Sequence, residues 1–305
     1  DGVLVQFGGQ TPLKIANELA NAGVPIIGTS PKNIDLAEDR EKFGKILDKL
    51  NVTCPQFGTG RTLDEVIVVA EKIGFPVLAR PSYVLGGQGM RIAVKQEELE
   101  RYVANILKTH PENAFLIDKY LEHAIEVDVD SVYDGEQLHI AGMMQHIEPA
   151  GVHSGDSTAV IPPYSLSEEI QATIRAYQER IAEAMDIQGF LNVQYAVKDD
   201  KVYILEANPR TTRTIPFLAK ATQRPEAAIG VKVMLGAKLS EFDLESKLKY
   251  WAIKEPVFPF DKFPGVKKEL GPEMKSTGES IYFAQDFKDE HFRKPFEFKN
   301  LYLSK

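Results

Sequence analysis

Two short segments carry three polar residues that could hold a metal ion. Alternate residues of a strand share a face. Gln194 therefore projects from one face of segment 192–197, and Glu206 and Asn208 project together from segment 203–208. Carboxylate and amide oxygens are ligands that Mg²⁺ accepts. If Gln194 lies opposite Glu206, the three oxygens converge on one metal; a solvated polar strand face is the simpler interpretation of each segment alone.

The shared site requires a particular connection between the two strands. Lys198 must pair with Val202, which leaves a three-residue loop at 199–201, or a five-residue loop if that pair is open. A two-residue Asp-Asp turn would place Gln194 and Glu206 on opposite faces. We therefore predict the odd-numbered loop. The apolar face of the second strand is then formed by Tyr203, Leu205 and Ala207.

Arginines follow the second strand directly. Arg210 and Arg213 lie in the segment 209–213, and guanidinium groups suit two-point contact with phosphate or carboxylate oxygens. Metal ligands beside paired arginines indicate an electrostatic clamp for phosphoryl transfer.

A glycine-rich segment at 82–90 joins two predicted strands, 75–80 and 91–94. No Gly-Lys-Ser/Thr follows it, so it is not a Walker loop. Its glycines permit close approach of the backbone to an anion. We expect either a hairpin lid over phosphates or an ordinary hairpin, with Arg80 placed to neutralise a phosphate.

An acidic strand is predicted at 125–132. Glu126, Asp128 and Asp130 alternate with valines, and a solvated strand face explains most of these acids. Glu126 is our candidate for binding ribose hydroxyls. The apolar run 117–121 could offer backbone groups to adenine.

Two glycines flank a His-Ser pair in the segment 148–157, which indicates a loop that contacts a ligand. Ser154 has no G-x-S-x-G context, so we set aside a covalent serine mechanism. The other histidines, apart from His153, show no metal-ligand spacing.

The remaining pattern predicts an α+β protein with mostly antiparallel sheets in its middle. A β-α-β unit with a parallel strand pair opens the chain, with strands at 3–7 and 24–27. Further strands are expected at 115–120, 138–146, 190–197 and 202–208. Helices are expected at 34–50, 63–73, 97–109, 168–185 and 217–234. Residues 237–305 show few clear periods.

Composition narrows the function. The 305 residues carry a net charge of −8 and no long basic run, which argues against a nucleic-acid surface. Cys54 is the only cysteine, so no internal disulfide is possible and a reducing, cytoplasmic setting fits. No apolar run reaches the roughly 20 residues that cross a bilayer, so we expect no membrane partner. The chain opens within a strand, and we expect residue 1 to lie inside a longer protein.

Several motifs together resemble one family. R-P-S-Y-V-L-G-G, E-V-D-V-D, G-V-H-S-G-D-S, N-V-Q-Y-A-V and E-A-N-P-R-x-x-R-T occur in this order. They resemble the ATP-grasp fold of the carbamoyl phosphate synthetase large subunit, over nearly all of residues 1–280. That subunit has two related halves. The segments 151–157 and 263–279 are typical of the second half, which phosphorylates carbamate with ATP.

The resemblance implies two α+β subdomains that clasp ATP, preceded by the end of a pre-ATP-grasp domain. It implies a pre-ATP-grasp end at 1–38, an ATP-grasp domain at 39–236 with a lid subdomain at about 76–148, and an extension at 237–305. The cofactors are then ATP and Mg²⁺, or Mn²⁺ in its place.

The resemblance also assigns roles residue by residue. The implied metal ligands are Gln194, Glu206 and Asn208. Arg210 and Arg213 would hold carbamate or the transferred phosphoryl group, with Asn208 beside them. The implied nucleotide contacts, besides Gln194 and Glu206, are Arg40, Arg80, Lys119, Leu121, Glu126, Gly151, Val152, His153 and Ser154.

The implied partners are the first half of the same large subunit, a glutamine amidotransferase small subunit and the small molecule carbamate. After Glu279 the sequence departs from the family's usual continuation. Two alternatives stay open: another ATP-grasp ligase that activates a carboxylate for an amine, and a non-catalytic nucleotide-binding module.

Overall fold

The N-terminal unit is the predicted β-α-β fragment. A computed structural model describes residues 1–81, 89–262, 265 and 268–286. Strands β1 (Val3–Leu4) and β2 (Ile26–Ile27) pair in parallel, as predicted, although both are shorter than expected. The helices that connect and follow them are α1 (Gln10–Lys14), α2 (Ala16–Asn21) and α3 (Pro31–Glu38).

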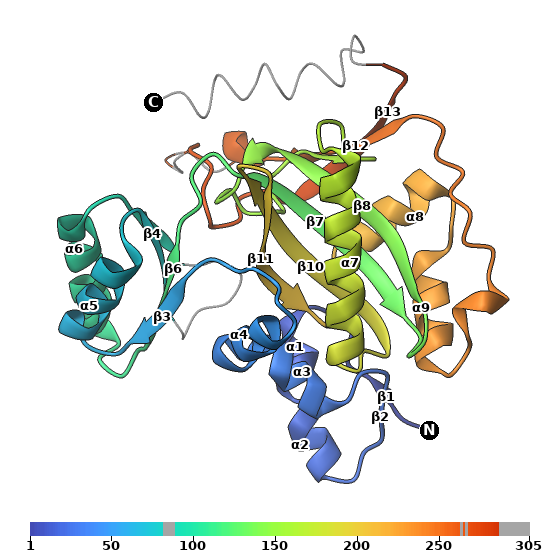
Figure 1. The fold of residues 1–305 in the computed structure, drawn as a ribbon, viewed down its shortest axis with the longest axis horizontal. Helices are drawn as coiled ribbons and strands as arrows, with labels where there is room; N and C mark the ends of the chain where they lie inside the picture. The colour runs from blue at the N-terminus through green and yellow to red at the C-terminus, as the bar shows by residue number, and fades with distance from the viewer. Residues whose placement is uncertain (82–88, 263–264, 266–267, 287–305) are drawn as a thin grey trace.

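A small antiparallel sheet forms a separate lobe, on the left in Figure 1. Its strands, in spatial order, are β3 (Phe57–Gly60), β6 (Phe115–Lys119), β4 (Val77–Pro81) and β5 (Arg91–Ala93). Helices α5 (Leu63–Ile73) and α6 (Gln96–Thr109) pack against it through an apolar core. Thr62 and Glu65 form a capping box that fixes the start of α5.

The seven-stranded antiparallel sheet is the centre of the molecule. In spatial order it contains β11 (Lys201–Asn208), β10 (Gly189–Lys198), β7 (Ile125–Tyr133), β8 (Leu138–Pro149), β9 (Ala159–Ile161), β12 (Trp251–Val257) and β13 (Gly278–Ala284). Helix α7 (Glu168–Ala184) packs with β7, β10 and β11 in one core cluster. Helices α8 (Thr214–Thr222) and α9 (Glu226–Met234) belong to a second cluster, and Figure 1 shows them apart from α7. The prediction of mostly antiparallel sheets is confirmed.

Two predicted helices are each divided in two. The helix expected at 34–50 is interrupted at Asp39, which is extended and whose side chain accepts from the first N–H groups of α4 (Arg40–Lys49). The helix expected at 217–234 is broken at Gln223, which has a left-handed conformation, and at Pro225. Proline has no backbone N–H to donate within a continuing helix, so the local sequence already contained this second break.

The division of the strands between the two sheets indicates where the lid subdomain begins and ends, and where the C-terminal region packs. The small sheet with its helices spans residues 57–119, whereas β7 and β8 lie in the large sheet. We therefore propose a lid subdomain at 57–119, which both begins and ends earlier in the chain than the expected 76–148. The region after residue 237, which showed few periods, contributes two strands to the large sheet.

A buried ionic cluster ties α9 to the large sheet. The fully buried Glu226 accepts from Arg224 Nε at 2.8 Å and lies 3.0 Å from His139 Nε2. Arg224 also donates to the carbonyl oxygens of Ala141 and Leu244. Burial acts to raise the pKa of Glu226, but the His139 and Arg224 contacts outweigh it and leave the pKa below its usual value.

We predict that Glu226→Gln lowers the free energy of unfolding by about 3 kcal/mol at pH 7, because it leaves Arg224 buried without a counter-charge. A depressed carboxylate pKa stabilises the fold above its ordinary value of 4.5. This contribution is lost as pH falls through the folded pKa. Denaturant unfolding at pH 7 and near pH 3 should show the gap between wild type and variant shrinking; an equal gap at both would contradict the prediction.

Candidate active site

The β10–β11 hairpin does not have the predicted loop. Lys198 pairs with Lys201, so the connection is a two-residue turn, Asp199-Asp200. Both aspartates have positive φ, at 50° and 57°, as a type I′ turn requires. The prediction of an odd-numbered loop is therefore wrong. In an uninterrupted ladder this turn would pair Gln194 with Leu205 and separate the metal ligands.

A β-bulge at Leu205 restores the required register. Tyr195 pairs with Ile204, yet the next residue, Gln194, pairs with Glu206, so that Leu205 is the extra residue. Gln194 and Glu206 therefore do lie opposite each other.

The apolar faces of β11 follow the same shift. Val202, Ile204 and Ala207 lie in the core under α7. Tyr203 and Leu205 pack on the other face, against Ala196. The predicted apolar face of Tyr203, Leu205 and Ala207 is corrected accordingly, because the bulge changes which alternate residues share a face.

Arg40 holds the bulge from α4. Its Nη1 donates to the carbonyl oxygen of Leu205 at 2.9 Å, and its Nη2 contacts Asp118 Oδ1 at 3.2 Å. The guanidinium also lies over the Phe57 ring, 4.9 Å from its centroid. Arg40 thus joins the small sheet to the strand that carries Glu206.

Asp118 links Arg40 to a second predicted arginine. Arg80 Nε lies 2.9 Å from Asp118 Oδ2, and Arg80 Nη1 lies 3.9 Å from Glu206 Oε2. Asp118 is buried and was not selected from the sequence. Its position in the middle strand of the small sheet, between β3 and β4, explains why it can receive both arginines.

The donor set fits a hard cation. Asn208 Nδ2 donates to Glu206 Oε1 at 2.8 Å and to Asn192 Oδ1 at 3.3 Å. An N–H donor and a cation both bind to a lone pair of a carboxylate oxygen. The Glu206 oxygen that accepts from Asn208 is therefore also a suitable metal ligand. The Glu206 side chain is 45% exposed and accessible to an incoming nucleotide. In the described part of the chain, no three His, Cys, Asp or Glu side chains form a metal cluster, and this site has one carboxylate with two amides.

Asp128 and Asp130 are buried, at 4% and 1% exposure, which contradicts the expectation of a solvated face. β7 lies between β10 and β8, and Asn192 on β10 donates to both carboxylates at 2.8 and 3.2 Å. Thr212 and Thr214 donate to Asp130. Burial raises the pKa of both aspartates. Strand alternation showed a shared acidic face, but its burial depends on the neighbouring strands and on the segment before α8.

Glu126 is also buried and lies beside a neutral histidine. His146 Nδ1 is 3.7 Å from Glu126 Oε1, and His146 Nε2 is 3.8 Å from Asp128 Oδ2. Burial raises the pKa of Glu126 to about 8, with Asp128 adding to the shift. Burial lowers the pKa of His146 to about 3. The sequence did not select His146, because a single histidine on a strand carries no spacing signal.

The loop after β8 carries Gly151, Val152, His153 and Ser154. Gly151 has φ of 101°, and a Cβ at this position would lie 2.8 Å from the Tyr120 ring. Burial lowers the pKa of His153, and the Arg213 guanidinium adds to this effect.

The segment 271–276 packs on this loop. The His153 N–H donates to the Gly271 carbonyl at 2.8 Å, and the buried Asp156 accepts from the backbone N–H groups of Lys275 and Ser276. The buried Lys254 of β12 donates to the Ser154 carbonyl at 3.0 Å. Sequence periodicity gave no signal for Lys254, because its burial arises from the pairing of β12 with β9 and β13.

A small apolar cluster joins the segment between β6 and β7, the residue after β8, and strands β10 and β11. Its members are Leu121, Ala124, Ala150, Ala196, Tyr203 and Leu205. Lys119 stands nearby in sequence, and its Nζ donates to the carbonyl oxygens of Gly74 and Phe75 at 2.9 and 2.8 Å. The bulged Leu205 therefore contributes its carbonyl to Arg40 and its side chain to this cluster.

Arg210 and Arg213 differ in their surroundings. Arg210 donates to Gln10 Oε1 at 2.6 Å, to the Thr211 carbonyl at 3.1 Å and to Asn208 Oδ1 at 3.0 Å. Arg213 is exposed and contacts the sulfur of Met274. The structure thus places Gln194 opposite Glu206 and brings Glu206, Asn208 and Arg210 together, whereas no contact joins Arg213 to them among the described residues. Of the glycine-rich lid, residues 82–88 lie outside the described residues.

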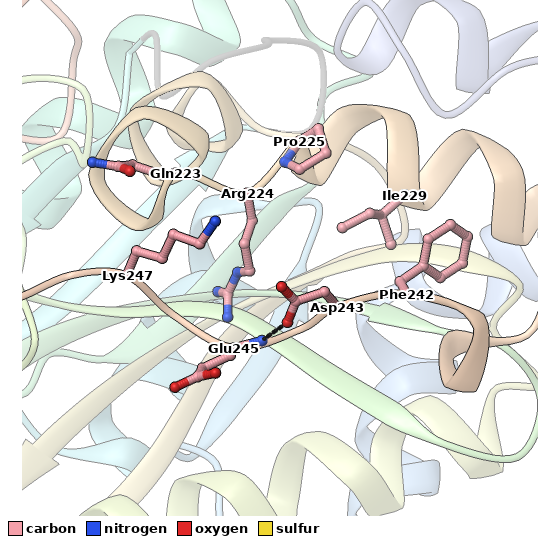
Figure 2. Close-up of a pocket in the computed structure, with 8 residues that line it drawn as sticks. All are labelled: Gln223, Arg224, Pro225, Ile229, Phe242, Asp243, Glu245 and Lys247. Atoms are coloured by element: carbon pink, nitrogen blue, oxygen red, sulfur yellow. Dashed lines mark hydrogen bonds between the residues drawn. The ribbon is translucent and has the colours of Figure 1, made fainter.

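A cavity of about 220 Å³ lies elsewhere, at the break between α8 and α9 (Figure 2). Its lining residues are Gln223, Arg224, Pro225, Ile229, Phe242, Asp243, Glu245 and Lys247. None is a predicted site residue, and the Arg224 guanidinium is already bonded within the buried cluster. No helix among the described residues has the length and hydropathy needed to cross a bilayer.

Residues 39–242 match the family described as "Carbamoyl-phosphate synthase L chain, ATP binding domain", and residues 1–36 match "Carbamoyl phosphate synthase preATP-grasp domain". The carbamoyl phosphate synthase large chain of Archaeoglobus fulgidus is 55% identical over 289 residues, covering 94% of this chain and 27% of that protein. The "C-terminal section" of the large chain of Methanocaldococcus jannaschii is 52% identical over 304 residues, covering 96% and 49%. The chain therefore spans at most about half the length of these relatives.

The fold has solved counterparts. The biotin carboxylase from Campylobacter jejuni, described as a β,γ-ATP complex, superimposes with a TM-score of 0.74 at 16% identity. The match covers 99% of this chain and 74% of that one, and it supports the fold alone. With both matched regions and this architecture, the chain belongs to the carbamoyl phosphate synthase large-chain family of ATP-grasp ligases.

Proposed function

We propose that this chain phosphorylates carbamate with ATP to give carbamoyl phosphate and ADP, the last step of carbamoyl phosphate synthesis. That synthesis uses bicarbonate, glutamine or ammonia, and two ATP. The observation that carries the proposal is the convergence of Gln194, Glu206 and Asn208 beside Arg80 and Arg210. The relative called a C-terminal section supports the assignment to this half of the synthesis.

The proposed transfer is a single in-line displacement. A carbamate oxygen forms the new bond to the γ-phosphorus, while the bond to the β,γ-bridging oxygen breaks and ADP leaves. Arg80, Arg210 and Arg213 balance charge on the transferred group. No protein nucleophile takes part. We propose that the glycine-rich lid excludes water, which matters because carbamate is unstable in it.

The cofactors in this proposal are ATP and Mg²⁺, or Mn²⁺ in its place. When bound at Gln194, Glu206 and Asn208, the metal would neutralise phosphate charge. Asn208 must then present its oxygen, which now accepts from Arg210, to the metal.

The nucleotide contacts we propose line the same region. Arg40 acts near the nucleotide through the Leu205 carbonyl that it holds. Lys119 and Leu121 lie at the adenine side, where the apolar cluster around Leu205 offers a surface for the base. Glu126 contacts the ribose. Gly151, Val152, His153 and Ser154 form the loop that follows the nucleotide.

The partners in this proposal are the first half of the same large subunit, which would make carbamate, and a glutamine amidotransferase small subunit. We propose a cytoplasmic location and no nucleic-acid or membrane partner.

The direct test is ATP formation from carbamoyl phosphate and ADP in the presence of Mg²⁺. We predict activity in the wild-type chain and a loss of at least about 100-fold in Glu206→Gln, because the only carboxylate among the three ligands loses its charge. A coupled ATP assay measures both.

The matched control is Glu179→Gln, an exposed position on α7, which should retain wild-type activity. Undiminished activity in Glu206→Gln would refute its metal role. A wild-type chain that binds MgADP by calorimetry but forms no ATP would refute carbamate phosphorylation, and a screen of other carboxylates with amines would then test for a different ligase.

A second prediction concerns the loop at Gly151. Gly151→Ala forces a side chain onto a residue with φ of 101° and against the Tyr120 ring. Left-handed strain costs about 1–2 kcal/mol at Gly151 and at Gly236 alike, but at position 151 the clash also displaces the loop from Tyr120, so we expect the KM for ADP to rise roughly tenfold. Gly236→Ala is the control, since its φ of 103° is nearly the same but its Cβ meets nothing within 4 Å. Equal ADP affinity in both variants would contradict the role of this loop.

A further inference from the structure

Arg210, one of the two arginines after β11, donates a hydrogen bond to a side chain of the N-terminal unit. Gln10, the first residue of α1, places its Oε1 2.6 Å from Arg210 Nε. The two residues are separated by 200 positions in the sequence. Figure 1 shows α1 near the carboxyl end of β11, and Arg210 follows β11 two residues later in the sequence.

The orientation of the Gln10 amide is itself fixed. Its Nε2 donates to Glu38 Oε2 at 2.6 Å. Burial raises the pKa of Glu38, and the hydrogen bond from Gln10 opposes this shift; in its ionised form the carboxylate can only accept hydrogen bonds. Glu38 therefore holds the amide nitrogen on its own side and leaves the oxygen facing Arg210.

The backbone of the arginine segment is attached to the same unit. Gln6 is fully buried, and its Nε2 donates to the Pro209 carbonyl at 2.9 Å. The backbone carbonyl oxygen of Gln6 accepts from the backbone N–H and the hydroxyl of Thr211, at 2.9 and 3.0 Å. The residues on either side of Arg210 are thus fixed before Gln10 acts on its side chain.

The geometry leaves Arg210 oriented but still charged. A guanidinium has five N–H groups, and three of them are bonded to Gln10, to the Thr211 carbonyl and to Asn208. Among the described residues, one N–H on each terminal nitrogen has no hydrogen-bond partner. Because Gln10 is neutral, it directs the guanidinium without cancelling the positive charge that an oxyanion needs.

We propose that Gln10, oriented by Glu38, is a positioning residue for the proposed reaction. It presents the two terminal N–H groups of Arg210 to the carboxylate of carbamate or to the transferred phosphoryl group. This inference rests on the function proposed above. It assigns the N-terminal unit a direct part in the substrate site.

The test compares Gln10→Met, which keeps length and removes both hydrogen bonds, with wild type. We expect kcat/KM for carbamoyl phosphate to fall about tenfold, with the KM for ADP unchanged. Gln10→Asn keeps the amide but is one methylene too short to reach both partners. It should likewise lower kcat/KM for carbamoyl phosphate and leave the KM for ADP unchanged. Gln171→Met, which removes one glutamine bond on α7, should change neither constant.

A second readout does not depend on activity. In ¹⁵N–¹H spectra, the Arg210 Nε–H, assigned with Arg210→Lys, should exchange slowly with water in wild type and at least about tenfold faster in Gln10→Met. Unchanged exchange, or an equal rise in both KM values with a lower Tm, would overturn the positioning role. If wild type forms no ATP yet this exchange difference is present, the proposed reaction fails while the Gln10–Arg210 contact stands.

Discussion

The candidate site depends on one irregularity of the backbone, the extra residue at Leu205. The two-residue turn fixes the start of the β10–β11 ladder, and by itself it would place Glu206 on the core side with Val193. The bulge moves the last three residues of β11 by one position. Glu206 and Asn208 then lie on the same face as Gln194 and Asn192, and Ala207, opposite Val193, moves into the core under α7. A change of one residue in register thus produces both a continuous core and a metal-binding face.

The bulge is held by a charged side chain of α4 that is itself paired with the small sheet. Arg40 takes the freed carbonyl of Leu205, and Asp118 of the small sheet holds both Arg40 and Arg80. Bulged residues leave a backbone group without a partner in the ladder, and a buried carbonyl without a partner is costly. A guanidinium satisfies this group and can still make a second contact. The consequence is that the position of the small lobe and the geometry of the metal ligands are linked by the same side chains.

Buried acids form a second level behind the ligands. Asp128 and Asp130 are bonded to Asn192, which in turn accepts from Asn208. Burial favours the protonated form of such carboxylates, and hydrogen bonds from Thr212 and Thr214 oppose it at Asp130. This network joins β7, β10 and β11 to the arginine segment, so that the ligand side chains have few alternative orientations. Gln6 and Gln10 complete the same arrangement from the N-terminal unit.

The sequence by itself determined the element types, the fold family and the residues that could bind metal or phosphate. These depend on local periodicity and on motifs such as E-A-N-P-R-x-x-R-T. It also contained the break at Pro225, which the helical pattern obscured. The tertiary structure alone decided the register of Glu206, the burial of Asp128 and Asp130, and the roles of Asp118, Lys254 and Gln10. The reason is physical: a bulge, a buried charge and a bond across 200 residues are fixed by partners on other elements, and alternation along a single strand carries no information about those partners.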